Sequence, residues 1–338
     1  MRLLRYGVVA LVVLTCVGAL APAPAVAFPA RLPQTTPLVT KTIQLKAPSK
    51  LSSKWTRIQK LTYGTGASKL GTSPGGEGLM IGPEYGVQVP DKTWWYADAA
   101  KLRLAHYSDG GTYLGQVKLP AKYLDQGVYF QWDRPIALAD GTVVLSSTTI
   151  DSPALLKLSP AGKLSRVTLS GFVTIVVTSG ASLYGFDESG DRVRVNPKTG
   201  SLTPVTMFKG QGGQLFDVSV GTGHINVTRP GVRLRLNLVD PDHPSTPVHP
   251  SVEVVVGADG KLWIYATGVV EVSPEEAYDV VGVFSVTAGG AVSAVGPSRV
   301  WYSAADPGDG QHLGMRYGSS RPTLMFIDTG AVRVYRRS

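Results

Sequence analysis

Residues 85–119 are the stretch that most constrains the fold, because they have the pattern of four short strands joined by tight turns. Residues 85–89 alternate in side-chain character and end at a Pro-Asp-Lys reversal, and residues 93–98 are rich in aromatic side chains. Residues 103–107 and 113–119 flank a Ser-Asp-Gly-Gly turn. A lone sheet of this size leaves an apolar face in water, so it requires similar sheets packed against it.

The first turn of this unit recurs at a regular spacing along the chain. The six copies begin at Asp91, Asp140, Ser179, Thr222, Asp259 and Asp309. Their mean spacing is about 44 residues, which is typical of four-stranded propeller blades. We therefore predict an all-β fold, a six-bladed β-propeller of four-stranded antiparallel blades over residues 54–338. One local exception is expected at residues 273–276, where Ser-Pro-Glu-Glu predicts a single helical turn.

The first unit resembles an NHL-type repeat. That pattern has an inner strand, an Asp-Gly-like turn, a strand ending in a small residue and Asp, a basic residue opening the next strand, and a second Asp-Gly-like turn. The matching residues are Val87, Val89, Asp91, Ala97, Asp98, Arg103, Asp109 and Gly110. Lys92 stands where the family usually has glycine. The resemblance implies a six-bladed ring around a channel and no particular function, because the same scaffold carries binders and enzymes.

Residues 1–27 have the three-part plan of a secretory signal peptide: two arginines, an apolar run over residues 6–20, and small residues up to Ala27. We predict cleavage after Ala27, and hence a secreted or cell-envelope protein. The apolar run is short for a membrane span, so no transmembrane segment is expected after cleavage. The alternative is lipidation at Cys16, the only cysteine. After cleavage at Ala27 the mature chain lacks cysteine, which excludes disulfides and thiolate metal sites.

Residues 28–53 carry four prolines among polar residues and are predicted to form an extended tether. Within this Pro-rich linker, residues 38–45 have a pattern compatible with a strand. Residues 55–63 alternate more clearly, and they are the best candidate for a strand that closes the ring. Because the last unit already counts four strands from residue 300 onward, the alternative is that this strand only covers an edge.

The formal net charge is +9. An excess of this kind attracts anionic partners such as envelope polymers, although a modest excess spread over a large surface also serves solubility alone. The sequence has no basic helix, zinc-finger spacing or aromatic-basic sheet motif, so no nucleic-acid partner is expected. We expect a monomer.

Residues just before each predicted inner strand should meet at one mouth of the channel. They comprise aromatic side chains, carboxylates and two arginines. The candidates are Glu84, Tyr85, Trp132, Asp133, Arg134, Phe172, Phe216, Asp217, Glu253 and Arg299. We therefore predict a binding module for a protein or glycan ligand, and we assign no catalytic residue.

The alternative function is a calcium-dependent hydrolase or lyase. Glu84, Asp133, Asp217 and Glu253 would supply the oxygen ligands that calcium prefers. Such a site resembles that of the gluconolactonase and regucalcin-like propellers. The competing expectation is that Arg134 or Arg299 pairs with these acids.

Histidine chemistry at the mouth is not expected from the sequence. His312 is assigned to a second or third strand, away from the axis. A zinc site from His243, His249 and Asp240 or Asp242 in the Pro-rich loop is a further metal hypothesis.

Overall fold

The computed structural model describes residues 36–46, 51, 53–74, 80–81, 83, 85–120, 135–147, 153–273, 276–295, 310–327 and 330–338. The chain divides into two units, Met1–Gln34 and Thr35–Ser338, and every described residue belongs to the second. The signal peptide, Cys16 and residues 28–35 of the linker lie outside the described residues, so those expectations remain predictions. Within the described ranges, no helix is long and apolar enough to cross a membrane.

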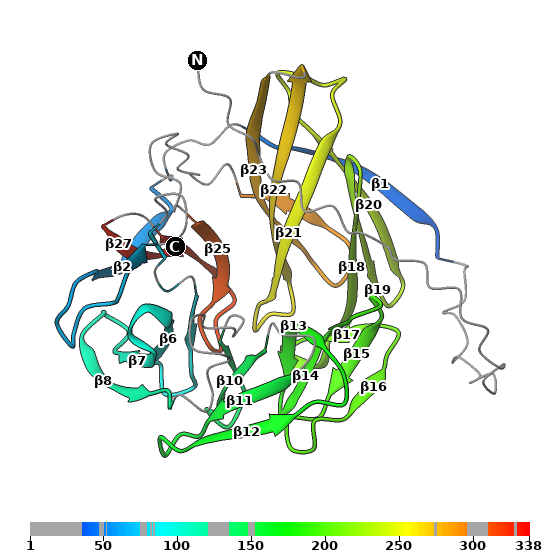
Figure 1. Cartoon of the computed structure of the whole chain (residues 1–338). Helices are drawn as coiled ribbons and strands as arrows, with labels where there is room; N and C mark the ends of the chain where they lie inside the picture. The colour runs from blue at the N-terminus through cyan, green and yellow to red at the C-terminus, as the bar shows by residue number, and fades with distance from the viewer. Residues whose placement is uncertain are drawn as a thin grey trace, which may run out of the picture. The chain divides into compact units, whose positions relative to one another are not determined.

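The second unit is a six-bladed β-propeller of four-stranded antiparallel blades, as the repeat predicted. The blades follow one another around the ring in chain order, from cyan through green and yellow to red (Figure 1). Read from axis to rim, blade 1 consists of β5 (Gly86–Gln88), β6 (Trp94–Asp98), β7 (Arg103–Tyr107) and β8 (Tyr113–Lys118). Blade 2 consists of β9 (Ile136–Ala137), β10 (Val143–Ser146), β11 (Ala154–Leu158) and β12 (Leu164–Thr168). Blade 3 consists of β13 (Val173–Ser179), β14 (Ser182–Asp187), β15 (Arg192–Val195) and β16 (Leu202–Pro204).

The last three blades use strands from both ends of the described chain. Read in the same direction, blade 4 consists of β17 (Phe208–Lys209), β18 (Leu215–Gly221), β19 (His224–Arg229) and β20 (Val232–Val239). Blade 5 consists of β21 (Val248–Val256), β22 (Leu262–Ser273), β23 (Glu276–Val286) and β24 (Val292–Ala294). Blade 6 consists of β25 (Gly310–Met315), β26 (Pro322–Ile327), β27 (Ala331–Arg337) and β2 (Trp55–Thr62). A separate short hairpin pairs β3 (Ser73–Pro74) with β4 (Met80–Ile81). Among the described residues, the remaining elements are two 3-10 turns, η2 (Ala99–Lys101) and η4 (Gln211–Gly213).

Every turn between a first and a second strand contains at least one residue with a positive φ. These residues are Lys92, Gly141, Gly180, Gly212 with Gly213, Gly260 and Gly318. The predicted turns were therefore right in blades 1, 2, 3 and 5 and wrong in blades 4 and 6. Thr222-Gly223 joins β18 to β19, and Gly310 begins β25. In blade 4 the first turn is the Gly-rich η4 segment, where the Gly210 amide donates to the Gln214 carbonyl at 2.8 Å.

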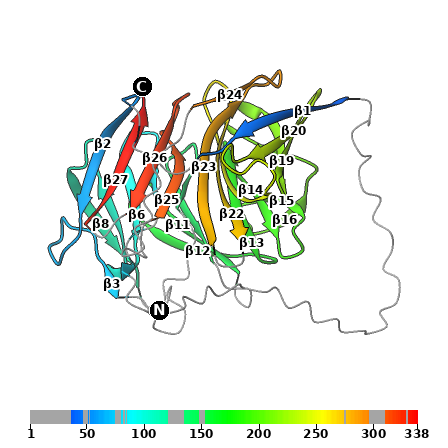
Figure 2. The same ribbon diagram turned by 90° about the horizontal axis from the view of Figure 1, so that it is seen from above.

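Strand β2 closes the ring. It pairs antiparallel with β27 from Trp55↔Arg337 to Thr62↔Ala331, and Figure 2 shows the two strands side by side. The described part of blade 6 supplies only three strands of its own, because β25 to β27 are its first, second and third. The prediction of a closing strand is therefore confirmed, and the alternative of an edge cover is wrong.

The segment before β2 joins blades 4 and 5 from outside. Residues 38–45 do form a strand, β1 (Leu38–Gln44), which pairs in parallel with β20 as a fifth strand of blade 4. The chain then reaches blade 5, where Lys46 and Val281 exchange two backbone hydrogen bonds of 3.1 and 2.9 Å. Leu45, between these contacts, is fully buried. We call residues 38–46 the belt.

Blade 5 is longer than the others, because β22 and β23 continue past the blade as a hairpin. Ser273 pairs with Glu276 at its tip, so both residues are in strands. The helical turn predicted for residues 273–276 is therefore wrong. Alternating apolar residues extend on both sides of the tip, and the strand pairing that they favour overrides the local capping signal.

The core consists of apolar layers between neighbouring blades. One layer joins Leu61 and Val332 of blade 6 to Trp94 of blade 1, and another joins Trp263 of blade 5 to Phe326 of blade 6. Each blade has two faces that need covering, and the ring covers both without an extra layer. The largest layer spans blades 3, 4 and 5, next to the short strand β17.

Candidate functional site

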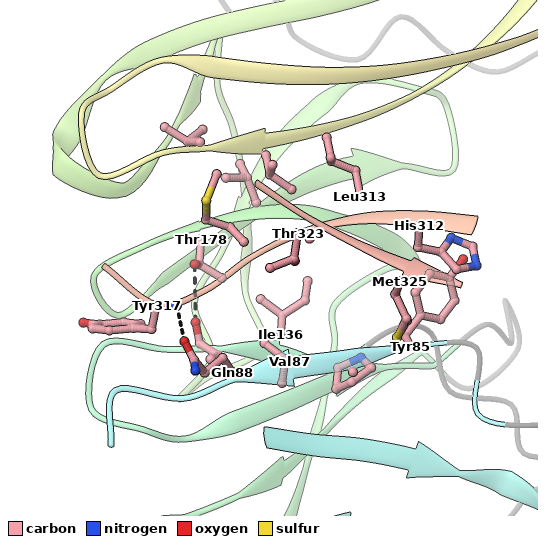
Figure 3. Close-up of a pocket in the computed structure, with 18 of the residues that line it drawn as sticks. Tyr85, Val87, Gln88, Ile136, Thr178, His312, Leu313, Tyr317, Thr323 and Met325 are labelled. Carbon is pink, nitrogen blue, oxygen red and sulfur yellow. Dashed lines mark hydrogen bonds between the residues drawn. The ribbon is translucent and has the colours of Figure 1, made fainter. Parts of the chain in front are cut away.

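A cavity of about 140 Å³ lies on the axis of the ring. Strands β5, β9, β13, β21 and β25 line it, which are the inner strands of five blades. Figure 3 shows Tyr85 and His312 at one end, Gln88 and Tyr317 at the other, and the apolar Ile136 between them. We call the end with Tyr85 and His312 the mouth.

The end opposite the mouth has polar groups that form hydrogen bonds with one another. The Gln88 amide donates to Asp109 Oδ1 at 2.9 Å and accepts from the Tyr317 backbone amide at 2.9 Å. Asp109 also accepts from the Trp94 indole at 3.1 Å and from Arg316. This network joins blade 1 to blade 6, and it gives these buried or half-buried polar groups hydrogen-bond partners within the fold.

The mouth brings together one residue from each of blades 1, 5 and 6. His312 Nδ1 lies 2.8 Å from Glu253 Oε1, and the Leu313 amide donates to the other oxygen of Glu253. The Tyr85 and His312 rings are in contact, with their centroids 4.1 Å apart and their planes tilted by 44°. The His312 and Glu253 side chains are 19% and 22% exposed, so solvent reaches both. Tyr265 pairs with Glu253 in the sheet, and burial first, then Glu253, raises the pKa of its phenol far above the ordinary value.

A larger cavity of about 390 Å³ opens beside the mouth, and we call it the side cavity. It lies where blade 4 has an inner strand of only two residues, β17, between the long inner strands β13 and β21. Phe186, Phe208 and Phe216 form its wall, with ring centroids 4.9 and 5.8 Å apart in succession. Tyr85 and Glu253 reach it from the mouth. The short strand thus exposes the second strand of its blade to an internal space.

The structure brings together some of the predicted site residues and separates others. Tyr85 and Glu253 meet at the mouth, and Phe216 lines the side cavity. Phe172 is half-buried and lines neither cavity. Asp217 lies on the second strand of its blade, not before the first, because the predicted register of that unit is off by one strand. Predicted residues outside the described ranges are Glu84, Trp132, Asp133, Arg134 and Arg299.

The described acids do not fit the hypothetical calcium site. Arg192 of blade 3 binds both oxygens of Asp217, at 2.5 and 2.7 Å. Both oxygens of Glu253 accept hydrogen bonds from blade 6. A calcium ion needs oxygen ligands that are free to turn toward one point. Within the described residues, no group of three or more His, Cys, Asp or Glu side chains could hold a metal ion.

The zinc hypothesis fails for a related reason. Asp240 is fully buried and accepts from the Tyr278 hydroxyl, and His243 Nδ1 lies 3.1 Å from the same carboxylate. Burial raises the pKa of Asp240, but these hydrogen bonds and that of the Asp242 amide outweigh it and lower the pKa overall. His249 is exposed on β21. The cluster links the loop before blade 5 to the long hairpin.

His312 is the mouth residue that the sequence prediction missed. The assignment to an outer strand was wrong, because it took Asp309-Gly310 as a turn within the blade and not as the start of β25. The signal that could have placed it is Arg316-Tyr317-Gly318-Ser319, a glycine-containing turn six residues after Gly310. Read with that turn, His312 is on an inner strand.

The fold and the mouth define the class: a six-bladed β-propeller whose channel opens beside an apolar side cavity. The chain belongs to the family described as a domain of unknown function, DUF7485, which matches residues 53–337. None of the curated proteins matches the chain. The family match does not extend to NHL repeats, so that resemblance stays a prediction.

Several solved structures are similar to the chain at low sequence identity. A putative exported protein from Bacteroides fragilis NCTC 9343 is 9% identical, with 88% of this chain and 99% of that chain covered and a TM-score of 0.47. Virginiamycin B lyase from Staphylococcus aureus is 13% identical, with 84% and 99% covered and a TM-score of 0.39. YCF48 bound to D1 peptide is 11% identical, with 86% and 99% covered and a TM-score of 0.44.

Proposed function

We propose that the propeller is a protein-binding module that accepts an apolar side chain of its partner in the side cavity. The observation that supports this is the phenylalanine-lined space beside the short strand β17, open toward Tyr85 and Glu253. Its volume of about 390 Å³ is within the range of roughly 300–1,000 Å³ that is usual for ligand sites. Partner recognition at the mouth of a propeller uses the loops and inner strands that converge there.

A protein fits the side cavity better than a glycan does. The wall is mostly apolar, and the Glu253 carboxylate at its edge already accepts two hydrogen bonds from His312 and the Leu313 amide. A sugar hydroxyl that enters such a space without a partner loses about 1–3 kcal/mol. A phenylalanine, leucine or similar side chain loses nothing and gains from burial.

The hydrolase alternative has less support. Asp217 and Glu253, the two described acids of its proposed set, are each bonded to a basic side chain from a neighbouring blade. A general base or metal ligand would need one of them to be released.

The export of the protein, proposed from the signal-peptide pattern of residues 1–27, can be tested by sequencing the N-terminus of the secreted form, which should begin at Phe28.

The binding proposal is tested by selecting linear random peptides on the immobilised full chain, with a glycan array in parallel. Ser251 is exposed at the edge of the side cavity, so Ser251→Trp should cover the opening without changing the core. Ser293→Trp, on the exposed outer strand β24 of the same blade, is the matched control. Selected peptides should share an aromatic or branched apolar residue. Ser251→Trp should weaken them by about tenfold or more, which is 1.4 kcal/mol, and Ser293→Trp should not.

Three results would reject the proposal. The proposal is rejected if glycans bind and no peptide is enriched. It is also rejected if the selected peptides are uniformly polar, or if Ser251→Trp binds them as tightly as the native chain does. A thermal melt of each variant separates loss of the site from loss of the fold.

A further inference from the structure

The positive charge of the chain is concentrated in blade 6. The described residues of this blade, 53–62 and 310–338 without 328–329, hold eight lysines and arginines and no acid. They are Lys54, Arg57, Lys60, Arg316, Arg321, Arg333, Arg336 and Arg337. The whole chain has a formal net charge of +9. Within the sequence of these two segments the one acid is Asp328, which lies outside the described residues.

Five of these cations lie on the two outermost strands: Arg57 and Lys60 on β2, and Arg333, Arg336 and Arg337 on β27. Lys60 of β2 is directly opposite Arg333 of β27, and Arg57 is opposite Tyr335. Arg57 and Lys60 are exposed, and Arg333 is half-exposed. Like charges directly opposite each other destabilise a sheet. The two strands come from opposite ends of the described chain, so only ring closure creates this stripe, which we call the basic edge.

The cations at the far end of the basic edge are crowded as well. Burial lowers the pKa of the Arg337 guanidinium, and the nearby Arg321 lowers it further. Arg337 Nε is buried without a hydrogen-bond partner among the described residues. Arg316 pairs with Asp109, but that acid belongs to blade 1.

We propose that the basic edge is a docking surface for a linear anionic polymer that carries phosphate or carboxylate groups. Charge complementarity is the first argument, because bound anions relieve the repulsion between neighbouring cations. Alternate residues on one strand are about 6.6 Å apart and neighbouring strands about 4.8 Å apart, so the cations form a narrow stripe that suits a chain. The site is separate from the mouth and does not depend on the proposed protein partner.

A lipid bilayer is a poorer fit to the same surface. Peripheral membrane binding combines cations with exposed apolar side chains that enter the bilayer. The large exposed apolar residues among the described positions lie in other blades or in the belt: Leu38, Val39, Leu102, Leu114, Leu215, Val220, Val269 and Val272. Blade 6 has none of them, so its described surface offers charge without an apolar anchor.

The test measures binding of fluorescent polyphosphate to the full chain at several sodium chloride concentrations. Arg57→Gln/Lys60→Gln removes two exposed cations of the basic edge, and Lys163→Gln/Arg194→Gln removes two exposed cations from blades 2 and 3 at the same net charge. The first double variant should bind roughly tenfold more weakly, and its slope of log affinity against log salt should fall by about 1.4–1.8. The control should match the native chain, as should Ser251→Trp at the mouth.

Several results would overturn the proposal. The proposal is overturned if the native chain does not bind polyphosphate near physiological salt, or if vesicles of anionic lipid bind more tightly than the polymer. It is also overturned if the two double variants lose affinity equally, because binding would then depend on net charge and not on the basic edge. Melting temperatures of both double variants, expected to match the native chain, confirm that the fold is intact.

Discussion

Asp98→Ala should lower the free energy of unfolding by about 3–5 kcal/mol, because it leaves a buried arginine without its carboxylate. Asp98 is fully buried and Arg103 is 2% exposed, with Arg103 Nε 2.7 Å from Asp98 Oδ2. Asp98 also accepts from the Gly71 amide at 3.0 Å, and Arg103 donates to the Ala67 carbonyl at 2.7 Å. The pair therefore anchors the segment before blade 1 to its second and third strands.

The assay is urea unfolding followed by tryptophan fluorescence, with a thermal melt as a second measure. The loss corresponds to a fall of roughly 6–15 °C in melting temperature for a domain of this size. Glu188→Ala, an exposed acid in a turn of blade 3, should change stability by less than about 0.5 kcal/mol. Asp98→Ala/Arg103→Met should be more stable than Asp98→Ala alone, because the lone buried charge is gone.

Two outcomes would refute this reasoning. Asp98→Ala lies within about 1 kcal/mol of the native chain, which would mean that water or another group satisfies the arginine. Or the double variant costs the sum of the two single changes, which would mean that the residues are not coupled.

Three further predictions concern the closing strand, the belt and the hairpin of blade 5. Leu61→Ala, on β2 and 4% exposed, should cost about 2–5 kcal/mol in urea unfolding because it opens a cavity between blades 6 and 1. Gly282→Ala should cost about 1–3 kcal/mol, because its Cβ would lie 2.7 Å from Leu45 Cδ2 of the belt; unchanged protection of the Lys46 amide in hydrogen exchange would contradict this. The lowered pKa of Asp240 stabilises the fold above the ordinary aspartate value of about 3.9, and this contribution is lost as the pH falls below it. Unfolding measured against pH should thus be flatter between about pH 5 and 2 for Asp240→Asn than for the native chain.

The architecture could be predicted from the sequence because a propeller repeats one strand-turn plan, and four of six turns were recognised by residue type alone. The turn assignment was wrong in blades 4 and 6, because turns at different places in a blade contain the same types of residue. Thr222-Gly223 and Asp309-Gly310 look like first turns, but the first turns of those blades contain Gly212-Gly213 and Gly318. A two-residue inner strand such as β17 has too little alternation to be detected.

The site was predicted only in part. Tyr85 and Glu253 were placed at the mouth because Tyr85 directly precedes the inner strand β5 and Glu253 lies within the inner strand β21, and the turn after each of these strands was recognised. His312 and Asp217 were misplaced because both belong to the two blades with the wrong register. The side cavity could not be predicted from the sequence, because it lies beside the short inner strand β17 and no sequence motif marks it.

The joint between β2 and β27 has a kinetic consequence. Ser338 donates to the Lys54 carbonyl across 284 positions of the chain, which is a contact between residues that are synthesised far apart in time. Such distant pairings form late, because the entropy of a long loop must be lost before any contact compensates for it. Until then blade 6 has an open edge at β27, and that edge can pair with another chain. Its arginines give the unfinished edge a like charge that keeps two such chains apart.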